Sequence, residues 1–213
     1  PKVSSNKISH VLMLHHNLAA SFFLKDLIQV LNQKTCEIID AVLDLDNLTI
    51  ENVFGNPISA RYSDIKLTNS TLHSSITGDL INVKYGKAYI KNCRFVGNDQ
   101  PDTDAIDYDE IENGVIKNCE IMNFYGSNSD AVDIGEKAVN ILIDSIWVNA
   151  ITDKGVSIGQ QSTATIKNSL FVNCNMGVAV KDSSVAIINK NTFYNNVNAI
   201  ACYEKNVGKA GGN

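Results

Sequence analysis

Two acidic runs stand 26 residues apart in the chain and carry side chains that could form a cation site. They are Asp104-Ala105-Ile106-Asp107-Tyr108-Asp109 and Asp130-Ala131-Val132-Asp133. Ca²⁺ takes about 6 to 8 oxygen ligands in a flexible geometry, and carboxylates are among the ligands that it prefers. If the runs lie together, the candidate Ca²⁺ ligands are Asp104, Asp107, Asp109, Asp130 and Asp133. The alternative is that these carboxylates are solvated charges, paired with cations along an outer surface.

Cationic and hydrogen-bonding residues fall beside these aspartates when the chain is aligned on its repeats. Arg61, Lys84 and Lys154 flank the acidic runs and are candidate ion-pair partners or proton acceptors. The outward residues that could bind a substrate are Asn82, Asp107, Asp133, Ser157, Lys181 and Tyr203. A tyrosine ring can also stack on a sugar, because it combines an apolar face with a polar edge.

Asparagine marks the repeat that brings these residues together. It occurs 26 times in 213 residues, mostly in short apolar-x-Asn units. The aligned column reads 52, 69, 92, 118, 144, 168 and 190. Asparagine tolerates the left-handed backbone of tight turns and hydrogen-bonds locally, so the column indicates one bend per repeat. A large apolar residue follows three positions after most of these bends, and this pattern predicts that Trp147 is a core residue.

Short runs with alternating polarity recur in step with the bends. In Ile81 to Val83, Ile106 to Tyr108 and Val132 to Ile134, apolar residues occupy one face and polar residues the other. No amphipathic helix separates these runs, which excludes a sheet built from β-α-β crossovers. We therefore expect an all-β solenoid, a single-stranded parallel β-helix of about seven coils over residues 47–205. Its coils would be stacked about 4.8 Å apart.

The two ends of the chain depart from the repeat. Leu18 to Asn32 has apolar residues at helical spacing after a plausible N-cap at Asn17, so residues 1–46 are expected to form a helical cap over the end of the solenoid. Residues 206–213 are rich in glycine and are expected to be a flexible tail.

Composition narrows the functional classes. The net charge of -5 and the absence of a basic cluster argue against nucleic-acid binding. No segment is apolar enough for a membrane span, and we expect no intact signal peptide in this sequence. We expect an extracellular or cell-surface location, with a signal peptide already removed. The oligomeric state is left open.

The coils resemble a right-handed parallel β-helix of the pectate-lyase-like superfamily. The runs Asp104 to Asp107, Asp153 to Gly159 and Gly177 to Asp182 are similar to those of secreted bacterial β-helix domains, namely the NosD-like repeats and the domains that accompany spore-coat-type kinase modules. Ser129 to Ile134 also looks like the Asn-Thr-Asp-Gly-Ile-Asp-Ile run of polygalacturonases. Lys154 stands where those enzymes have histidine, and their paired Asp-Asp and Arg-Ile-Lys elements are missing.

Three functional classes follow from this resemblance. The first is a non-catalytic extracellular module that binds a glycan or a surface partner, or serves as a rigid scaffold in a longer protein. The second is a calcium-assisted uronate lyase, in which a cation stabilises the intermediate and Lys84, Arg61 or Lys154 removes the proton. The third is a polygalacturonase-like hydrolase with a pair of carboxyl groups as acid and base.

Overall fold

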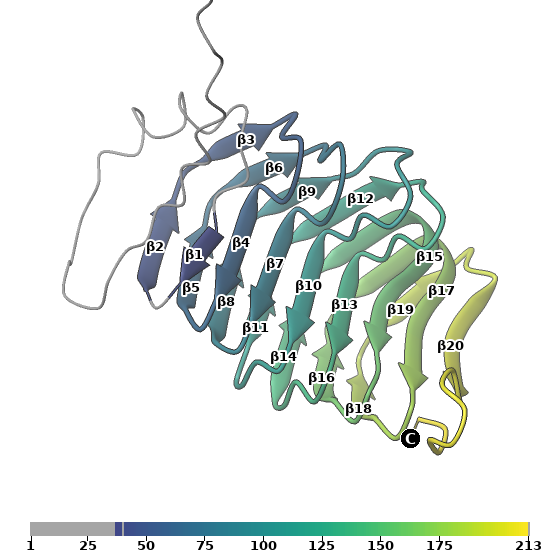
Figure 1. Cartoon of the computed structure of the whole chain (residues 1–213). Coiled ribbons are helices and arrows are strands. Elements are labelled where there is room, and N and C mark those ends of the chain that lie inside the picture. Colours follow the sequence, from purple (N-terminus) through teal and green to yellow (C-terminus); the bar gives the residue numbers. More distant parts are fainter. Residues whose placement is uncertain (1–36, 40, 213) are drawn as a thin grey trace, which may run out of the picture.

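The computed structural model describes residues 37–39 and 41–212 of the chain and shows a solenoid of parallel strands (Figure 1). The described residues form strands, turns and bends but no helix. Each coil contributes one strand to each of three sheet faces. Because every strand pairs in parallel with the strands of adjacent coils, residues some two dozen apart in the sequence become neighbours.

The first sheet face carries the acidic runs. Its strands are β1 (Glu37–Ile39), β4 (Ile58–Arg61), β7 (Ile81–Lys84), β10 (Ile106–Asp109), β13 (Val132–Gly135) and β20 (Asn198–Tyr203). The second face has one strand in each of seven coils, β2 (Val42–Asp46), β5 (Asp64–Thr68), β8 (Lys87–Lys91), β11 (Val115–Lys117), β14 (Ile141–Asp144), β16 (Thr163–Lys167) and β18 (Val185–Asn189). The third face contains β3 (Thr49–Glu51), β6 (Thr71–His73), β9 (Arg94–Val96), β12 (Glu120–Phe124) and β19 (Thr192–Tyr194).

Two long strands connect the third face with the first. They are β15 (Trp147–Ile158) and β17 (Leu170–Lys181), each of 12 residues. The first half of each strand pairs on the third face and the second half on the first face, so the two faces form one continuous sheet. The bend within β15 and β17 is marked by a break in register between Ile151 and Lys154.

The ends of the solenoid differ from the sequence expectation. Strands β1 and β2 precede residue 47, because the alternating segment Val42–Asp46 pairs along its length with β5. The helix expected over residues 18–32 lies outside the described residues. In the tail, the Ala210 carbonyl accepts a hydrogen bond from the Ser183 amide at 2.7 Å, and the flexibility of the tail stays a prediction.

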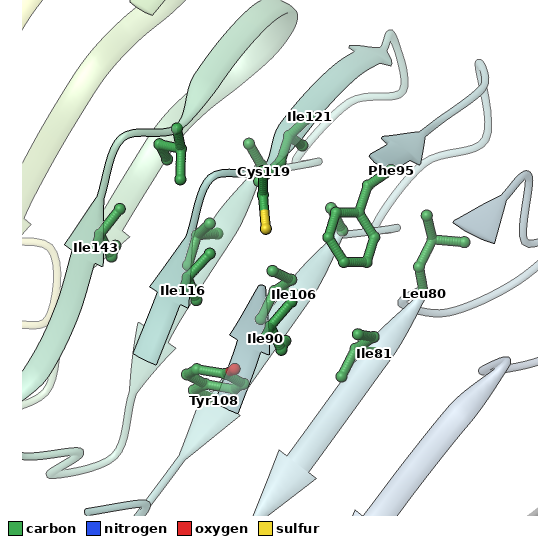
Figure 2. Packing of buried hydrophobic residues seen from close by; sticks show 14 of the residues in the cluster. Leu80, Ile81, Ile90, Phe95, Ile106, Tyr108, Ile116, Cys119, Ile121 and Ile143 are labelled. Carbon is green, nitrogen blue, oxygen red and sulfur yellow. The ribbon is translucent and has the colours of Figure 1, made fainter. Parts of the chain in front are cut away.

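The inward side chains stack into ladders that form one apolar core. Ile81, Ile106 and Val132 are fully buried in successive coils of the first face, and Figure 2 shows the packing around Ile106 and Tyr108. The rings of Phe171 and Phe193 stack with their centroids 5.2 Å apart. Burying such columns removes apolar surface from water along the whole length of the solenoid, which is the main stabilising contribution to the fold.

The column of bends is real, but two of its predicted members were wrong. Lys117 and Lys167 both pair with Asp144, so the residue in register with Asn118 and Asn168 is Ser145. In the first coil, the pairing of Asp46 with Thr68 puts Asn47 in this column in place of Asn52. All members have left-handed φ angles between 51° and 59°, and they are Asn47, Asn69, Asn92, Asn118, Ser145, Asn168 and Lys190.

This one-residue difference reverses the expected orientation of Trp147. Trp147 pairs with Glu120 and Leu170 and points outward with 37% of its surface exposed, whereas Val148 is fully buried between Ile121 and Phe171. The prediction that Trp147 is a core residue was therefore wrong. The sequence alignment missed the extra residue before the bend, and a shift of one residue moves every side chain of a strand to the opposite face.

The register can be checked by comparing substitutions of two aromatic residues on neighbouring strands, one on each side of the sheet. Phe171→Ala should lower the free energy of unfolding by about 3–5 kcal/mol because it leaves a cavity in the core. Trp147→Ala should lower it by at most about 1 kcal/mol, as expected for a residue on the surface. Chemical denaturation of both variants measures the difference. A loss for Trp147→Ala as large as that for Phe171→Ala would contradict the outward orientation.

Candidate functional site

The two acidic runs lie side by side on the outward surface of the first sheet face. Asp107 pairs in register with Asp133, and the same column continues from Asn82 on one side to Ser157 on the other. A second outward column places Lys84, Asp109, Gly135, Gly159, Lys181 and Tyr203 on the matching strands. We call the outward surface of β7, β10, β13, β20 and the second halves of β15 and β17 the acid-lysine face.

A third column of aspartates has a structural function that sequence analysis missed. The Asp79 carboxylate accepts a hydrogen bond from the backbone N–H of Asp104 at 3.0 Å, and Asp104 accepts one from the N–H of Asp130 at 2.6 Å. Asp130 in turn accepts the N–H of Lys154 at 2.9 Å. Each carboxyl group thus caps an amide of the next coil. Asp104 and Asp130, expected as Ca²⁺ ligands, already use one oxygen in this way.

Burial and crowding raise the pKa values of these acids. Burial is the largest cause at Asp107, and the neighbouring charges of Asp109, Asp79 and Asp133 add to it, so the pKa of Asp107 rises to about 8. Burial, followed by the charge of Asp133, raises the pKa of Asp130 to about 7. The pKa of Asp104 is also raised well above its usual range, chiefly by burial. At neutral pH, the face therefore holds carboxyl groups that can donate a proton.

The three cations proposed as proton acceptors have different environments. The Lys154 ammonium lies 2.5 Å from an oxygen of Asp153 and 3.3 Å from one of Asp130. Burial opposes the charge of Lys154, but the two carboxylates outweigh it and raise the pKa of this lysine.

Lys84 is paired with Asp109 at 2.5 Å. Burial likewise opposes its charge, but this partner raises the pKa of Lys84 above its usual value. Arg61 is exposed and in register with Lys84. A raised pKa makes Lys84 and Lys154 poor bases at neutral pH.

The pKa of Lys181 is shifted in the opposite direction from the pKa values of Lys84 and Lys154. It is only 4% exposed, and burial, its largest influence, lowers the pKa of its ammonium group despite the attraction of Asp133. Its side chain lies across Gly159, where a Cβ atom would approach the Lys181 Cε to 3.2 Å. Among the described residues, its Nζ has no hydrogen-bond or ion-pair partner. Lys181 was predicted as a binding residue, but its lowered pKa could not be read from the sequence.

Ser157 and Tyr203 complete this part of the face. Ser157 continues the Asp107–Asp133 column and is fully buried, yet its hydroxyl group has no hydrogen-bond partner. Tyr203 is in register with Lys181, and burial raises the pKa of its hydroxyl. Within the described ranges, the buried hydroxyl group of the core residue Tyr108 also has no hydrogen-bond partner. An unsatisfied polar group in a buried position typically costs about 1–3 kcal/mol.

Residues that sequence reasoning missed include Asp153 and Asp79. Asp153 holds the Lys154 ammonium, and its position directly before Lys154 was the signal that could have found it. Asp79 fits the same column as Asp104 and hydrogen-bonds with Asn82 at 3.0 Å. Within the described ranges, no group of three or more histidine, cysteine or acidic residues is arranged to hold a metal ion. Nor do these ranges contain a helix long and apolar enough to cross a membrane.

Comparison with known proteins supports the architecture. The chain matches the family model described as a right handed beta helix region over residues 26–209. No curated protein and no solved structure matches the chain. The matched region includes all the described strands and therefore the whole acid-lysine face. The chain belongs to the right-handed β-helix family.

Proposed function

We propose that the acid-lysine face binds a carbohydrate polymer and that the chain acts as a non-catalytic extracellular binding module. The observation that carries this proposal is the column of partly exposed hydrogen-bonding side chains on successive coils of this face, Asn82, Asp107 and Asp133. Sugar hydroxyl groups both donate and accept hydrogen bonds, so they can pair with the carboxyl and amide groups of this column.

The geometry of the face suits a linear polymer. Three successive coils present the partly exposed side chains of Asn82, Asp107 and Asp133 in one column, at the spacing of parallel strands, about 4.8 Å. A polymer lying along the stack would meet one hydrogen-bonding side chain in each of these coils. The carboxyl and amide groups of this column would fix the register of a repeating ligand, while Lys181 and Tyr203 border the same surface.

Binding can be tested with a panel of soluble and insoluble polysaccharides, measured by retention and by calorimetry. Asp133→Asn and Lys181→Met should each weaken binding of the retained polymer at least tenfold, equivalent to about 1.4 kcal/mol. The matched controls Asp44→Asn and Lys66→Met alter an exposed ion pair on the second sheet face and should leave binding unchanged. Equal affinity of all four variants would rule out the acid-lysine face as the binding surface.

Glycoside hydrolysis is a second candidate function, favoured by the pKa of about 8 at Asp107. Hydrolases of this type need a protonated carboxyl group beside a second carboxyl group, and Asp107 lies next to Asp133. The same panel distinguishes the two functions. Release of reducing ends indicates hydrolysis, whereas products that absorb in the near ultraviolet indicate a lyase, and retention without either indicates binding alone.

The protonation of Asp107 predicts how stability changes with pH. Between the ordinary carboxyl pKa near 4 and about 8, the folded chain holds a proton that the unfolded chain has released. Low pH favours the state that binds more protons, so stability should fall as pH rises through this window and level off above it. Urea unfolding at about pH 5.5 and about pH 8.5 should show this loss, and a smaller loss for Asp107→Asn.

Asp44→Asn is the control for this comparison, since it removes an exposed carboxyl on another face. It should keep the pH dependence of the parent chain. Asp130, with its pKa of about 7, contributes to the same trend, so some dependence should persist in Asp107→Asn. If Asp107→Asn and the parent lose the same stability between the two pH values, Asp107 is not protonated in the folded chain.

A calcium ion on this face, as the lyase reading requires, is a further proposal. A divalent cation would offset the repulsion between Asp107 and Asp133, and the lysine best suited to accept a proton beside it is Lys181, because its pKa is lowered. This proposal predicts a higher melting temperature with calcium than with a chelator, and a smaller difference when Asp107→Ala and Asp133→Ala are combined. Identical melting curves of the parent with calcium and with chelator would exclude it.

A further inference from the structure

A depression of about 330 Å³ lies at the junction of the second and third sheet faces, separate from the acid-lysine face. We call it the tryptophan pit, after the residue on its wall. It spans three successive coils and is shallow and open to solvent. The side chains that line its opening are Asn118, Glu120, Ser145, Trp147, Asn168 and Leu170.

The pit exists because the asparagine ladder is interrupted at this point. In the preceding coils, the Asn92 amide donates to Asn69 at 3.0 Å and the Asn118 amide donates to Asn92 at 3.3 Å. The next member of the column is Ser145, whose hydroxyl turns to Asp144 at 2.9 Å. A serine side chain is shorter than an asparagine side chain. The side-chain hydrogen bond that would continue the ladder from Asn118 is therefore missing, and a hollow remains.

The groups around the pit are those that recognise a sugar ring. Trp147 and Leu170 are each 37% exposed and are paired in register, so they form an apolar wall. Glu120, which is paired with Arg94 at 3.8 Å, and the side-chain carbonyl of Asn118 supply hydrogen-bond acceptors beside this wall. A pyranose has an apolar face of C–H groups and a rim of hydroxyls. An indole ring beside fixed polar groups matches that distribution.

We propose that the tryptophan pit binds one ring of a neutral saccharide, stacked on Trp147 and hydrogen-bonded to Glu120 and Asn118. None of the residues that line the pit is basic, which disfavours an anionic ligand. The apolar wall of one indole and one leucine is smaller than the patches that mark protein interfaces, typically a few hundred Å². The proposal is independent of the carbohydrate site proposed for the acid-lysine face.

The chain contains one tryptophan, so its intrinsic fluorescence reports on this pit alone. The experiment titrates the parent chain with neutral oligosaccharides of glucose, galactose, mannose, xylose and N-acetylglucosamine, and with an oligogalacturonate for comparison. At least one neutral sugar should shift the emission of Trp147 saturably, and the oligogalacturonate should not. Calorimetry of the same sugar with Trp147→Ala should show at least a tenfold loss of affinity.

Ser145→Asn is the decisive variant, because it fills the pit and leaves Trp147, Glu120 and Asn118 in place. Asparagine tolerates the left-handed backbone of this position, φ 59°, so the variant should fold and melt at or above the temperature of the parent. It should lose the sugar response of Trp147, whereas Asp133→Asn should keep it. A sugar response that survives in Ser145→Asn, or the absence of a response to every neutral sugar, overturns the proposal and leaves a protein contact as the alternative for Trp147.

Discussion

The structure depends on one constraint, the parallel register that hydrogen-bonds each coil to the next. With this register, equivalent residues of adjacent coils lie about 4.8 Å apart, whatever their chemistry. Apolar residues gain from it, because Ile90 and Ile116 bury their side chains against each other in the core. Acidic residues do not, because two neighbouring carboxylates repel. The acid-lysine face is the place where the fold accepts this unfavourable arrangement.

The chain limits the repulsion in three ways on the same face. Asp104 and Asp130 each accept a backbone N–H of the next coil, which fixes the carboxyl groups in place. Asp109 is neutralised by Lys84. In the part of the chain that the structure describes, the hydrogen-bond partner of the Asp107 carboxyl is the Asn82 amide at 2.6 Å, and the pKa of Asp107 rises to about 8. Groups with strongly perturbed pKa values tend to mark functional sites, because a fold selected for stability alone has no need of them.

The periodicity of the sequence predicted the fold and the proximity of Asp107 and Asp133, because both depend only on which residues recur at the coil length. It did not predict the orientation of Trp147. The length of each coil is set by its turns. A comparison of apolar and polar positions does not detect one added turn residue before Ser145, so it assigns the wrong register to the following strand. The lowered pKa of Lys181 could not be predicted from the sequence either, because it arises mainly from burial in the folded chain.

Both candidate sites occur where a ladder changes to a smaller residue. In the bend column, Ser145 replaces asparagine and leaves the hollow beside Trp147. On the acid-lysine face, Gly159 follows Asp109 and Gly135 in its column, and the Lys181 side chain lies across it. A complete ladder satisfies its own hydrogen bonds and presents a uniform surface to solvent. An interrupted ladder leaves hydrogen-bonding groups without a partner in the ladder, and it leaves an open space beside them. Ligand binding requires both. In a solenoid of this kind, the positions that break the repeat are therefore more informative about function than those that follow it.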